Sequence, residues 1–240
     1  MNYLRAIRLN EAPEESSYLH DLPAIVHLGQ LDSLTFEQPV TFFVGENGTG
    51  KSTILEAIAI AMGFNPEGGG REHTFATRDT HSQLSRLITT IKSRHPSDGF
   101  FLRAESFYNM ATYLEDNSEM KRYGGKSLHQ QSHGEAFLSL VSNRFDSSGF
   151  YILDEPESAL SPVRQMSLLV EMDRLVKYGS QFIIATHSPI LMAFPKAQIY
   201  QFSQDGIESV RYQDTEHYRL TRQFLEDPER MLHYLLEDDI

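Results

Sequence analysis

The chain has 240 residues, 40% hydrophobic and 22% charged, which is enough for one sizeable core and is typical of an ordinary globular protein. Its 21 basic and 33 acidic residues give a formal net charge of -12. This charge argues against diffuse, sequence-independent attraction to a polyanion, although a local basic face stays compatible with it. Because the chain has no cysteine, a disulfide framework and thiolate chemistry are excluded.

Features that would direct the chain into or across a membrane are missing from the sequence. The longest apolar helical stretch, ILEAIAIAM, is interrupted by Glu56 and is shorter than a membrane span requires. The start, MNYLRAIRLNEAPEE, lacks the apolar core of a signal peptide and is too acidic for a transit peptide. We therefore expect a cytoplasmic protein with no membrane span of its own.

The N-terminal part predicts short strands followed by one helix. YLRAIRL alternates loosely, and PAIVHLGQLDSLTFEQPVTFFVG carries several β-rich pieces separated by turn residues. Its last piece, VTFFVG, is the continuous apolar run of a strand buried on both faces. A glycine-rich turn follows, and STILEAIAIAMGF then predicts a helix that stops at Gly63.

The middle of the chain, from about residue 80 to 145, has a mostly helical and polar pattern. SQLSRLITTIKSR (82–94) predicts an amphipathic helix, GFFLRAES (99–106) a strand, and HGEAFLSLVSNRF (133–145) a second helix.

The C-terminal part predicts two further buried strands, a hairpin and three helices. GFYILD and SQFIIATHS are apolar strands, and the helix between them has Ser161 as N-cap, Pro162 at its first position and Gly179 as its stop. QIYQF and IESVRY, joined by SQDG, predict a hairpin. TEHYRLTRQFLEDPERMLHYLLE predicts two short helices separated by Asp-Pro, which either cap the core, the alternative that we favour, or bind a partner. Strands that alternate with helices predict an α/β protein with a parallel sheet.

The turn GENGTGKS, Gly45 to Ser52, satisfies the GxxxxGK[ST] pattern with a strand before it and a helix after it. Its glycines let successive N–H groups point at phosphate oxygens, and the start of the helix adds partial positive charge. Lys51 would reach the β- and γ-phosphates of a nucleotide, and the Ser52 hydroxyl would bind Mg²⁺. The predicted nucleotide cradle consists of Gly45, Asn47, Gly48, Thr49, Gly50, Lys51, Ser52 and Thr53.

The stretch YILDEPESALSP places Asp154, Glu155 and Glu157 within four positions, where they repel one another unless positive charge lies among them. In a P-loop site an acid at the end of an apolar strand holds the shell of the metal. We therefore predict Asp154 as a metal ligand beside Ser52, and Glu155 as the residue that orients or deprotonates the attacking water. An acidic turn at the end of a strand is the alternative interpretation.

Five ordered segments resemble the ABC-type ATPases. GENGTGKS, QSHGE, ILDEP, SALS and IIATHSP, between Gly45 and Pro189, correspond to the Walker A, signature, Walker B, D-loop and His-switch elements. The resemblance implies a P-loop NTPase fold in one domain, residues 1–240. A mainly parallel core sheet flanked by helices would carry an N-terminal antiparallel β part and a small helical lobe at about residues 72–145. It also implies hydrolysis of ATP with Mg²⁺.

In LHQQSHGEAF, Ser132 can begin a helix and Glu135 can complete a capping box, so the N-terminus of the helix would present N–H groups to an anion. In the family this anion is the γ-phosphate of a nucleotide held by the opposite subunit, which implies an ATP-dependent homodimer. The residues that match are Ser132, Gly134 and Glu135, whereas His133 replaces the usual first glycine. A simple capped helix, or a metal site of His129 and His133, are the alternatives.

The resemblance also places His187 at the edge of the sheet beside Glu155, where it would donate a hydrogen bond to the γ-phosphate or the water. The family has a metal-contacting Gln at the end of a strand, and no Gln of this chain aligns with it. Glu105 or Ser106 lies in that neighbourhood, and we predict Glu105 as a metal ligand, with a surface acid as the alternative. Glu157 is expected to tune the turn or the dimer contact.

The endings DEPESALS and THSP resemble the soluble branch of the family, which is related to the structural-maintenance-of-chromosomes and recombination-repair ATPases and to small stand-alone predicted ATPases. Residues 71–131 show no sustained heptads, so a long coiled coil is not expected. The first hypothesis is ATP-driven dimer closure coupled to a protein partner or nucleic acid. The second is the nucleotide-binding subunit of a transporter that docks on a separate membrane protein. A non-hydrolysing nucleotide sensor is disfavoured by Glu155 and His187. For the adenine contact, Arg5, Tyr3 and the glycine-rich loop are all candidates.

Overall fold

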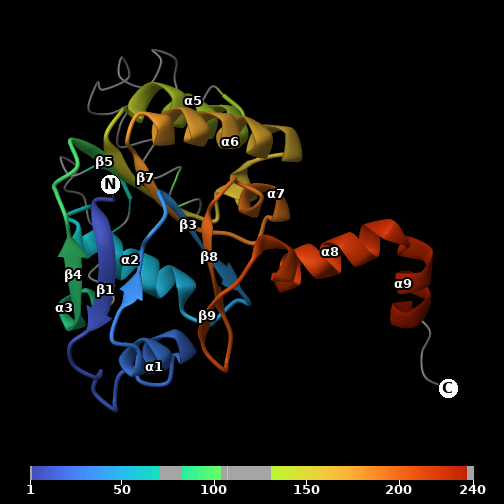
Figure 1. Ribbon diagram of the computed structural model, residues 1–240. Helices are drawn as coiled ribbons and strands as arrows, with labels where there is room; N and C mark the ends of the chain where they lie inside the picture. Colours follow the sequence, from blue (N-terminus) through green and yellow to red (C-terminus); the bar gives the residue numbers. More distant parts are fainter. Residues whose placement is uncertain (1, 67, 71–82, 104–106, 108–130, 237–240) are drawn as a thin grey trace.

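The computed structural model describes residues 2–66, 68–70, 83–103, 107 and 131–236 of the chain. Two sheets organise this part of the protein (Figure 1). The larger one has six strands in the order β5-β6-β7-β3-β8-β9, in which the first five run parallel and β9 pairs antiparallel with β8. Its strands are β3 (Val40–Gly45), β5 (Asp98–Arg103), β6 (Gly149–Asp154), β7 (Gln181–Ala185), β8 (Gln198–Phe202) and β9 (Ile207–Ser209).

The smaller sheet is antiparallel and has the order β2-β1-β4. It consists of β1 (Leu4–Leu9), β2 (Leu34–Thr35) and β4 (Ile88–Lys92). The expected combination of a mainly parallel core sheet with an N-terminal antiparallel part is therefore confirmed.

Helices cover both faces of the larger sheet (Figure 1). On one face lie α5 (His133–Arg144), α6 (Pro162–Lys177) and α7 (Pro189–Met192), and on the other lie α1 (Pro23–Gln30), α2 (Lys51–Ala61) and α3 (Leu84–Leu87). Short 3₁₀ turns follow two of the strands, η3 (Pro156–Ala159) and η4 (Tyr212–Asp214).

The continuous apolar strands are explained by this double coverage. Successive side chains of a strand point to opposite faces, so Phe42 packs into the core beneath α5 and α6, and Phe43 packs into the core beneath α1 and α2. Both side chains are fully buried. The same alternation applies to Ile183 and Ile184 in β7.

Several predicted elements are confirmed near the bounds expected from sequence. The helix α6 begins with Pro162 at its first position after Ser161, and Gly179 ends it with φ of 88°. The hairpin β8–β9 forms around Asp205 and Gly206, and α5 covers the segment expected for the signature helix.

Two predictions of local structure were wrong. Residues 23–30 form the helix α1 and not a strand. Pro23 at its start is pre-organised for a helix, and Ala24, Ile25 and Leu28 are buried together on one face. The helix expected at 82–94 covers only Leu84–Leu87 and then becomes β4, whose ITTIK sequence is rich in β-branched residues and pairs with β1. Residues 88–92 and 98–103 thus belong to the two sheets, while half of the predicted helical lobe at 72–145 lies outside the described residues.

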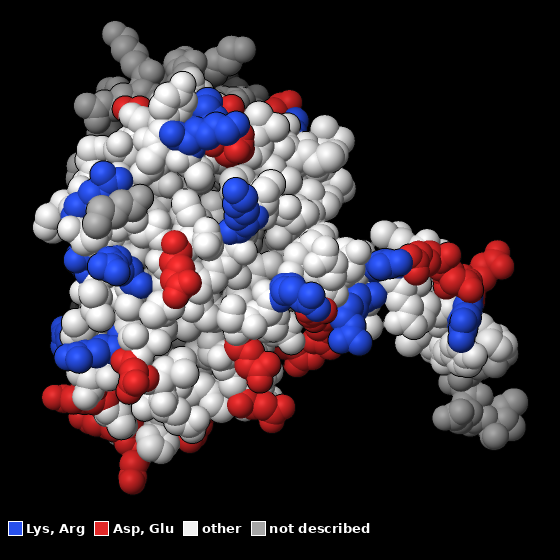
Figure 2. All heavy atoms as spheres, viewed as in Figure 1, with Lys and Arg blue, Asp and Glu red and all other residues white. Residues whose placement is uncertain are grey.

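The two C-terminal helices exist as predicted, but they do not cap the core. The helices α8 (Glu216–Glu226) and α9 (Pro228–Leu236) contain no buried residue and stand away from the body as an arm, which Figures 1 and 2 both show. The arm exposes large apolar side chains, namely Leu220, Phe224, Leu225, Leu232, Tyr234, Leu235 and Leu236.

Candidate functional site

The phosphate-binding turn connects the end of β3 to the start of α2, as the sequence predicted. Two of its glycines are required by close packing as well as by backbone conformation. A Cβ on Gly45, which has φ of 131°, would lie 2.0 Å from the carbonyl oxygen of Phe202 on the neighbouring strand. A Cβ on Gly50, with φ of 101°, would lie 2.8 Å from Cβ of Ala24 in α1. Gly48 also has positive φ, but the space around it is open. The turn is therefore held between β8 and α1.

Lys51 lies inside this turn and is only 4% exposed. Its Nζ donates to the carbonyl oxygens of Gly45, at 2.7 Å, and Glu46, at 2.6 Å. Burial lowers the pKa of Lys51, because it disfavours the charged form, and the carboxylates of Glu155 and Asp154 oppose this effect. The ammonium group is thus held where the turn curls, at the position from which it would contact phosphate oxygens.

Two oxygen ligands suited to Mg²⁺ meet beside the turn. The Ser52 hydroxyl donates to Oδ1 of Asp154 at 3.0 Å, and Asp154, the last residue of β6, is 7% exposed. Mg²⁺ typically takes only one or two protein oxygens and completes its shell with water and substrate phosphates. The pair therefore fits the metal. The described residues contain no group of three or more His, Cys, Asp or Glu that is arranged to hold a metal ion.

Some metal ligands considered from sequence cannot be compared with this pair. Glu105 and Ser106 are outside the described residues, as is His129, so Glu105 stays a prediction. Sequence reasoning missed Arg103, which ends β5 directly opposite Asp154 in the parallel register. Its Nε lies 3.5 Å from Oδ2 of Asp154, and its Nη1 lies 2.8 Å from Oε2 of Glu56 in α2.

Glu155 and His187 face one another across the ends of β6 and β7. Glu155 is in the left-handed conformation, with φ of 50°, and its N–H donates to the carbonyl of Ala185 at 2.9 Å. This turn leaves its carboxylate 42% exposed, with Oε1 at 3.7 Å from Nε2 of His187. The structure thus brings together the two residues that the sequence proposed for the chemistry.

Glu157 holds the loop that carries His187. Its Oε2 accepts from the Thr186 hydroxyl at 2.7 Å, and its Oε1 accepts from the backbone N–H of His187 at 2.5 Å. Burial raises the pKa of Glu157, and these two hydrogen bonds oppose the rise. Within one chain, this carboxylate therefore fixes the turn around His187.

A second histidine, which sequence reasoning missed, contacts His187 from the arm. Nδ1 of His187 lies 2.9 Å from Nε2 of His217, the second residue of α8. Burial lowers the pKa of both rings, and the charge of Lys51 lowers them further. Thirty residues separate the two histidines, and no local pattern in the sequence indicates their contact.

The signature segment forms the capped helix start that was predicted. Ser132 is the N-cap of α5, and the capping box with Glu135 is complete. Arg164 of α6 donates to the Ser132 hydroxyl at 2.9 Å and pairs with Glu135 at 2.9 Å. A Cβ on Gly134 would lie 2.7 Å from this guanidinium group, so glycine lets the arginine approach. The ring of His133 packs against Phe107.

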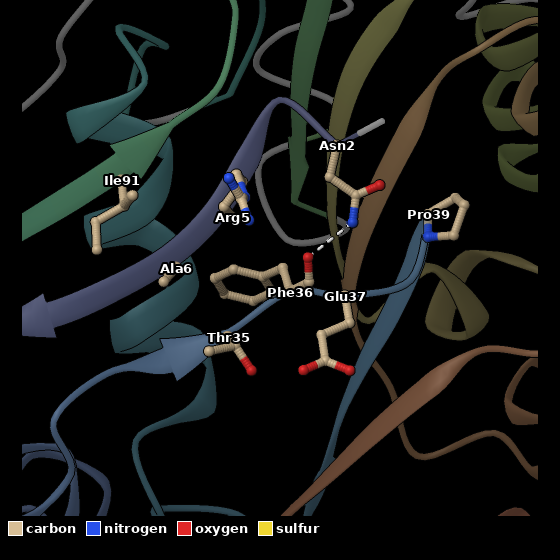
Figure 3. Close-up of a pocket in the computed structure, with 8 residues that line it drawn as sticks. All are labelled: Asn2, Arg5, Ala6, Thr35, Phe36, Glu37, Pro39 and Ile91. Atoms are coloured by element: carbon tan, nitrogen blue, oxygen red, sulfur yellow. Dashed lines mark hydrogen bonds between the residues drawn. The ribbon is translucent and has the colours of Figure 1, made fainter.

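A hollow of about 820 Å³ lies away from this site, on the small antiparallel sheet (Figure 3). It is lined in part by Asn2, Arg5, Phe36 and Pro39. Pro39 precedes the first residue of β3, whereas the phosphate-binding turn follows its last residue. Arg5 therefore lies near the start of β3, whereas a nucleotide bound in the turn would lie at the end of β3, so Arg5 is not placed to contact its adenine. Tyr3, the other candidate from β1's neighbourhood, is 1% exposed and its ring is not available for stacking.

Comparison with known proteins agrees with the geometry. A family model described as an AAA domain matches residues 26–134, and a second matches residues 135–193, with a description that names an AAA domain and the AbiEii toxin of a type IV TA system. An uncharacterized ABC transporter ATP-binding protein of Haemophilus influenzae is 26% identical over 180 residues, covering 66% of this chain and 67% of the relative. These matches support an ABC-type P-loop ATPase.

Solved structures of ATP-binding cassettes share the fold of this chain. CbiO1 from Clostridium perfringens, part of the ABC transporter complex cbiONQ, has a TM-score of 0.54 at 16% identity and covers 99% of this chain and 100% of its own. A nucleotide-free ATP-binding cassette from an ABC transporter has a TM-score of 0.51 at 14% identity, covering 98% and 99%. Among the helices of the part that the structure describes, none combines the length and the apolar character needed to cross a membrane.

Proposed function

We propose that this ABC-type ATPase binds Mg-ATP in the turn at Gly45–Ser52 and hydrolyses it to ADP and phosphate. The observation that carries the proposal is the position of Glu155. Its exposed carboxylate faces His187 at 3.7 Å, on the sheet edge that also holds Lys51, Ser52 and Asp154.

The proposed chemistry is in-line attack of water on the γ-phosphorus, with catalysis supplied by positioning and electrostatics. Mg²⁺ bound by Ser52 and Asp154 would neutralise charge on the β- and γ-phosphates. Lys51 would contact the same phosphates, Glu155 would orient or accept a proton from the water, and His187 would donate a hydrogen bond to the γ-phosphate or the water. Lys51, Ser52, Asp154 and the loop that carries His187 are already held by hydrogen bonds within the chain.

The site would be completed by a second copy of the chain. In the family the N-terminus of the signature helix binds the γ-phosphate in the opposite subunit, and here Ser132 and Glu135 form a complete cap that Arg164 holds by contacts to both side chains. ATP-driven closure of this head-to-tail homodimer would be coupled to a partner protein or a nucleic acid.

A second candidate function is the ATPase subunit of a transporter, which would dock on a separate membrane protein. It is favoured by the names of the relatives, an ABC transporter ATP-binding protein and part of an ABC transporter complex. The two functions differ in the partner and not in the reaction.

The substitution Glu155→Gln tests the reaction. It keeps the size of the side chain but removes the charge that accepts a proton, and general-base catalysis typically contributes about 10²–10⁴ in rate. We expect kcat to fall at least a hundredfold while ATP affinity is kept, and dimer to accumulate with Mg-ATP on size-exclusion chromatography. Glu171→Gln, which alters an acid paired with Arg174 on α6, is the matched control. Wild-type turnover in Glu155→Gln would show that Glu155 is the wrong residue.

The partner is tested by ATPase assays with duplex DNA, single-stranded DNA, RNA and membrane extract, run beside affinity capture. Stimulation by a nucleic acid supports the first function, and co-purification of an integral membrane protein supports the second. ATPase activity that rises with the square of the protein concentration, when that concentration is low, supports a site that a second copy of the chain completes. Strictly linear activity in a protein that stays monomeric with ATP contradicts it.

A further inference from the structure

The ring of His187 is held by the arm through a contact between two imidazoles. Nδ1 of His187 and Nε2 of His217 are 2.9 Å apart, which is a hydrogen-bond distance. The outer nitrogen of each ring, Nε2 of His187 and Nδ1 of His217, is buried and has no hydrogen-bond partner among the described residues. In this contact one ring nitrogen must donate and the other must accept, and the tautomers of the two rings determine which does so.

Two arrangements of protons satisfy this contact. A neutral imidazole has one N–H donor and one bare acceptor nitrogen. Either His217 donates from Nε2 and His187 carries its own proton on Nε2, or His187 donates from Nδ1 and its Nε2 is bare. The outer nitrogen of His217 has no partner in either case, so it does not favour one arrangement over the other.

Glu155 decides between the two arrangements. Its Oε1 lies 3.7 Å from Nε2 of His187, and a negative oxygen attracts an N–H group but repels the lone pair of a bare nitrogen. A γ-phosphate at the site would act in the same direction. The arrangement with the proton on Nε2 of His187 is therefore the stable one, and it requires His217 to be the donor.

We propose that His217 is a positioning residue for His187. By donating its Nε2–H to Nδ1 of His187, it holds the ring in place and keeps the proton on the nitrogen that faces Glu155 and the reacting phosphate. This inference rests on the proposed ATPase function. It adds a residue outside the five family motifs, and it makes the state of His187 depend on how α8 is seated.

The local structure at the start of α8 holds His217 firmly. Thr215, the N-cap of α8, is fully buried, and its hydroxyl donates to the carbonyl of Tyr212 at 2.8 Å and accepts from the N–H of Tyr218. The ring of Tyr218 packs on that of Tyr212. The base of the arm is thus ordered against the body, although the rest of the arm is exposed.

The charged groups around the pair favour two neutral rings. Burial lowers the pKa of both histidines, and the positive charge of Lys51 lowers it further. Nearby acids raise the pKa, but they offset this lowering only in part. The opposing acids are Glu155 for His187, and Glu216 and Glu46 for His217, while Glu157 accepts a hydrogen bond from the backbone N–H of His187. Because neutral rings can adopt either tautomer, a donor that selects one of them has an effect at neutral pH.

The first test reads the tautomer directly and does not require hydrolysis. Long-range ¹H–¹⁵N spectra of the full ¹⁵N-labelled chain distinguish a protonated from a bare ring nitrogen, and a His187→Gln sample assigns the signals. We expect Nε2 of His187 to be protonated and Nδ1 to be a bare acceptor near neutral pH. Protonation on Nδ1 would overturn the proposal, and this result is independent of whether the wild type hydrolyses ATP.

The second test separates donation from packing. His217→Phe keeps the ring but removes the donor, so we expect kcat to fall about fivefold to tenfold, the value of one hydrogen bond, with little change in KM for ATP. His217→Gln restores a donor at a similar position and should recover most of kcat. His233→Phe, an exposed histidine of α9, is the control and should match the wild type. A folded His217→Phe that keeps the wild-type kcat, or a His217→Gln as slow as His217→Phe, contradicts the proposal.

The third test measures how the loss of kcat in His217→Phe depends on pH. When His187 is protonated, it carries protons on both nitrogens, and no donor is needed to place one on Nε2. The ratio of kcat between wild type and His217→Phe should therefore shrink as pH falls below the pKa of His187. A ratio that is constant with pH would indicate a structural role only and would overturn the assignment.

Discussion

The substitution Gly45→Ala tests whether the first glycine of the phosphate-binding turn serves packing as well as the nucleotide. The added Cβ would lie 2.0 Å from the carbonyl oxygen and 3.0 Å from the carbonyl carbon of Phe202. These atoms belong to the backbone of β8, which pairs with β3 at Gly45. Neither can rotate away as a side chain would, so the two central strands must separate or shift.

The expected cost has two parts. Forcing extra atoms into a close-packed interior costs about 1–3 kcal/mol, and a non-glycine residue in a sparsely populated region of positive φ costs a further ~1–3 kcal/mol. We expect the free energy of unfolding to fall by about 2–6 kcal/mol, a large part of the roughly 5–15 kcal/mol by which a domain is stable. In a chain of this size about 2–4 °C of Tm accompanies each kcal/mol, so Tm should fall by about 4–24 °C.

Gly48→Ala is the matched control, because Gly48 lies in the same turn with φ of 80° and no atom within 4 Å of the added Cβ. Its free energy of unfolding should fall only by the cost of placing alanine in the left-handed conformation, about 1–2 kcal/mol. The assay is urea unfolding followed by circular dichroism, with Tm from a parallel thermal scan. If Gly45→Ala is no less stable than Gly48→Ala, the close approach of Phe202 is wrong.

Two further substitutions test the charged groups of the site. Lys51→Ala should weaken ATP binding about 10- to 150-fold, since a hydrogen bond to a charged group contributes about 1.5–3 kcal/mol. Titration calorimetry measures the affinity, and Lys177→Ala, which alters an exposed lysine on α6, is the control. Unchanged ATP binding in Lys51→Ala would contradict the P-loop assignment. Glu157→Ala should cost about 2–3 kcal/mol, because the Thr186 hydroxyl and the N–H of His187 lose their buried acceptor. Burial raises the folded-state pKa of Glu157 above its unfolded value, so the folded state binds the proton more tightly and loses stability as pH rises above the ordinary value of about 4.3. Glu157→Gln should flatten this slope in unfolding measured between pH 4.5 and 7, and an unaltered slope would show that another group causes it.

Much of the fold could be predicted because the decisive patterns are local. The caps of α6, with Ser161 and Pro162 at one end and Gly179 at the other, specify its bounds within a few residues. The capping box at Ser132 and Glu135 is equally local and is confirmed. Elements whose state depends on distant partners were less predictable. β4 is a strand because β1, some eighty residues earlier, pairs with it, and nothing within ITTIK reports that partner.

Only the site residues that lie within sequence motifs could be predicted. The turn at Lys51 and the acids at Asp154 and Glu155 lie within recognisable segments, and parallel strands bring their ends together at one edge. Arg103 and His217 reach the same edge through strand register and through the path of the arm. Neither residue lies in a recognisable motif, so both were missed.

The three acids at the end of β6 and just after it differ in environment, and this difference resolves their mutual repulsion. Asp154 is buried, with the Ser52 hydroxyl on one oxygen and the guanidinium group of Arg103 near the other. Glu157 is turned inward, where two donors of the His187 loop occupy its oxygens. Glu155 alone keeps a partly exposed carboxylate, 42% accessible, because its left-handed backbone turns it away from the strand. The geometry therefore leaves one acid for solvent and substrate, and it gives the other two to the chain itself.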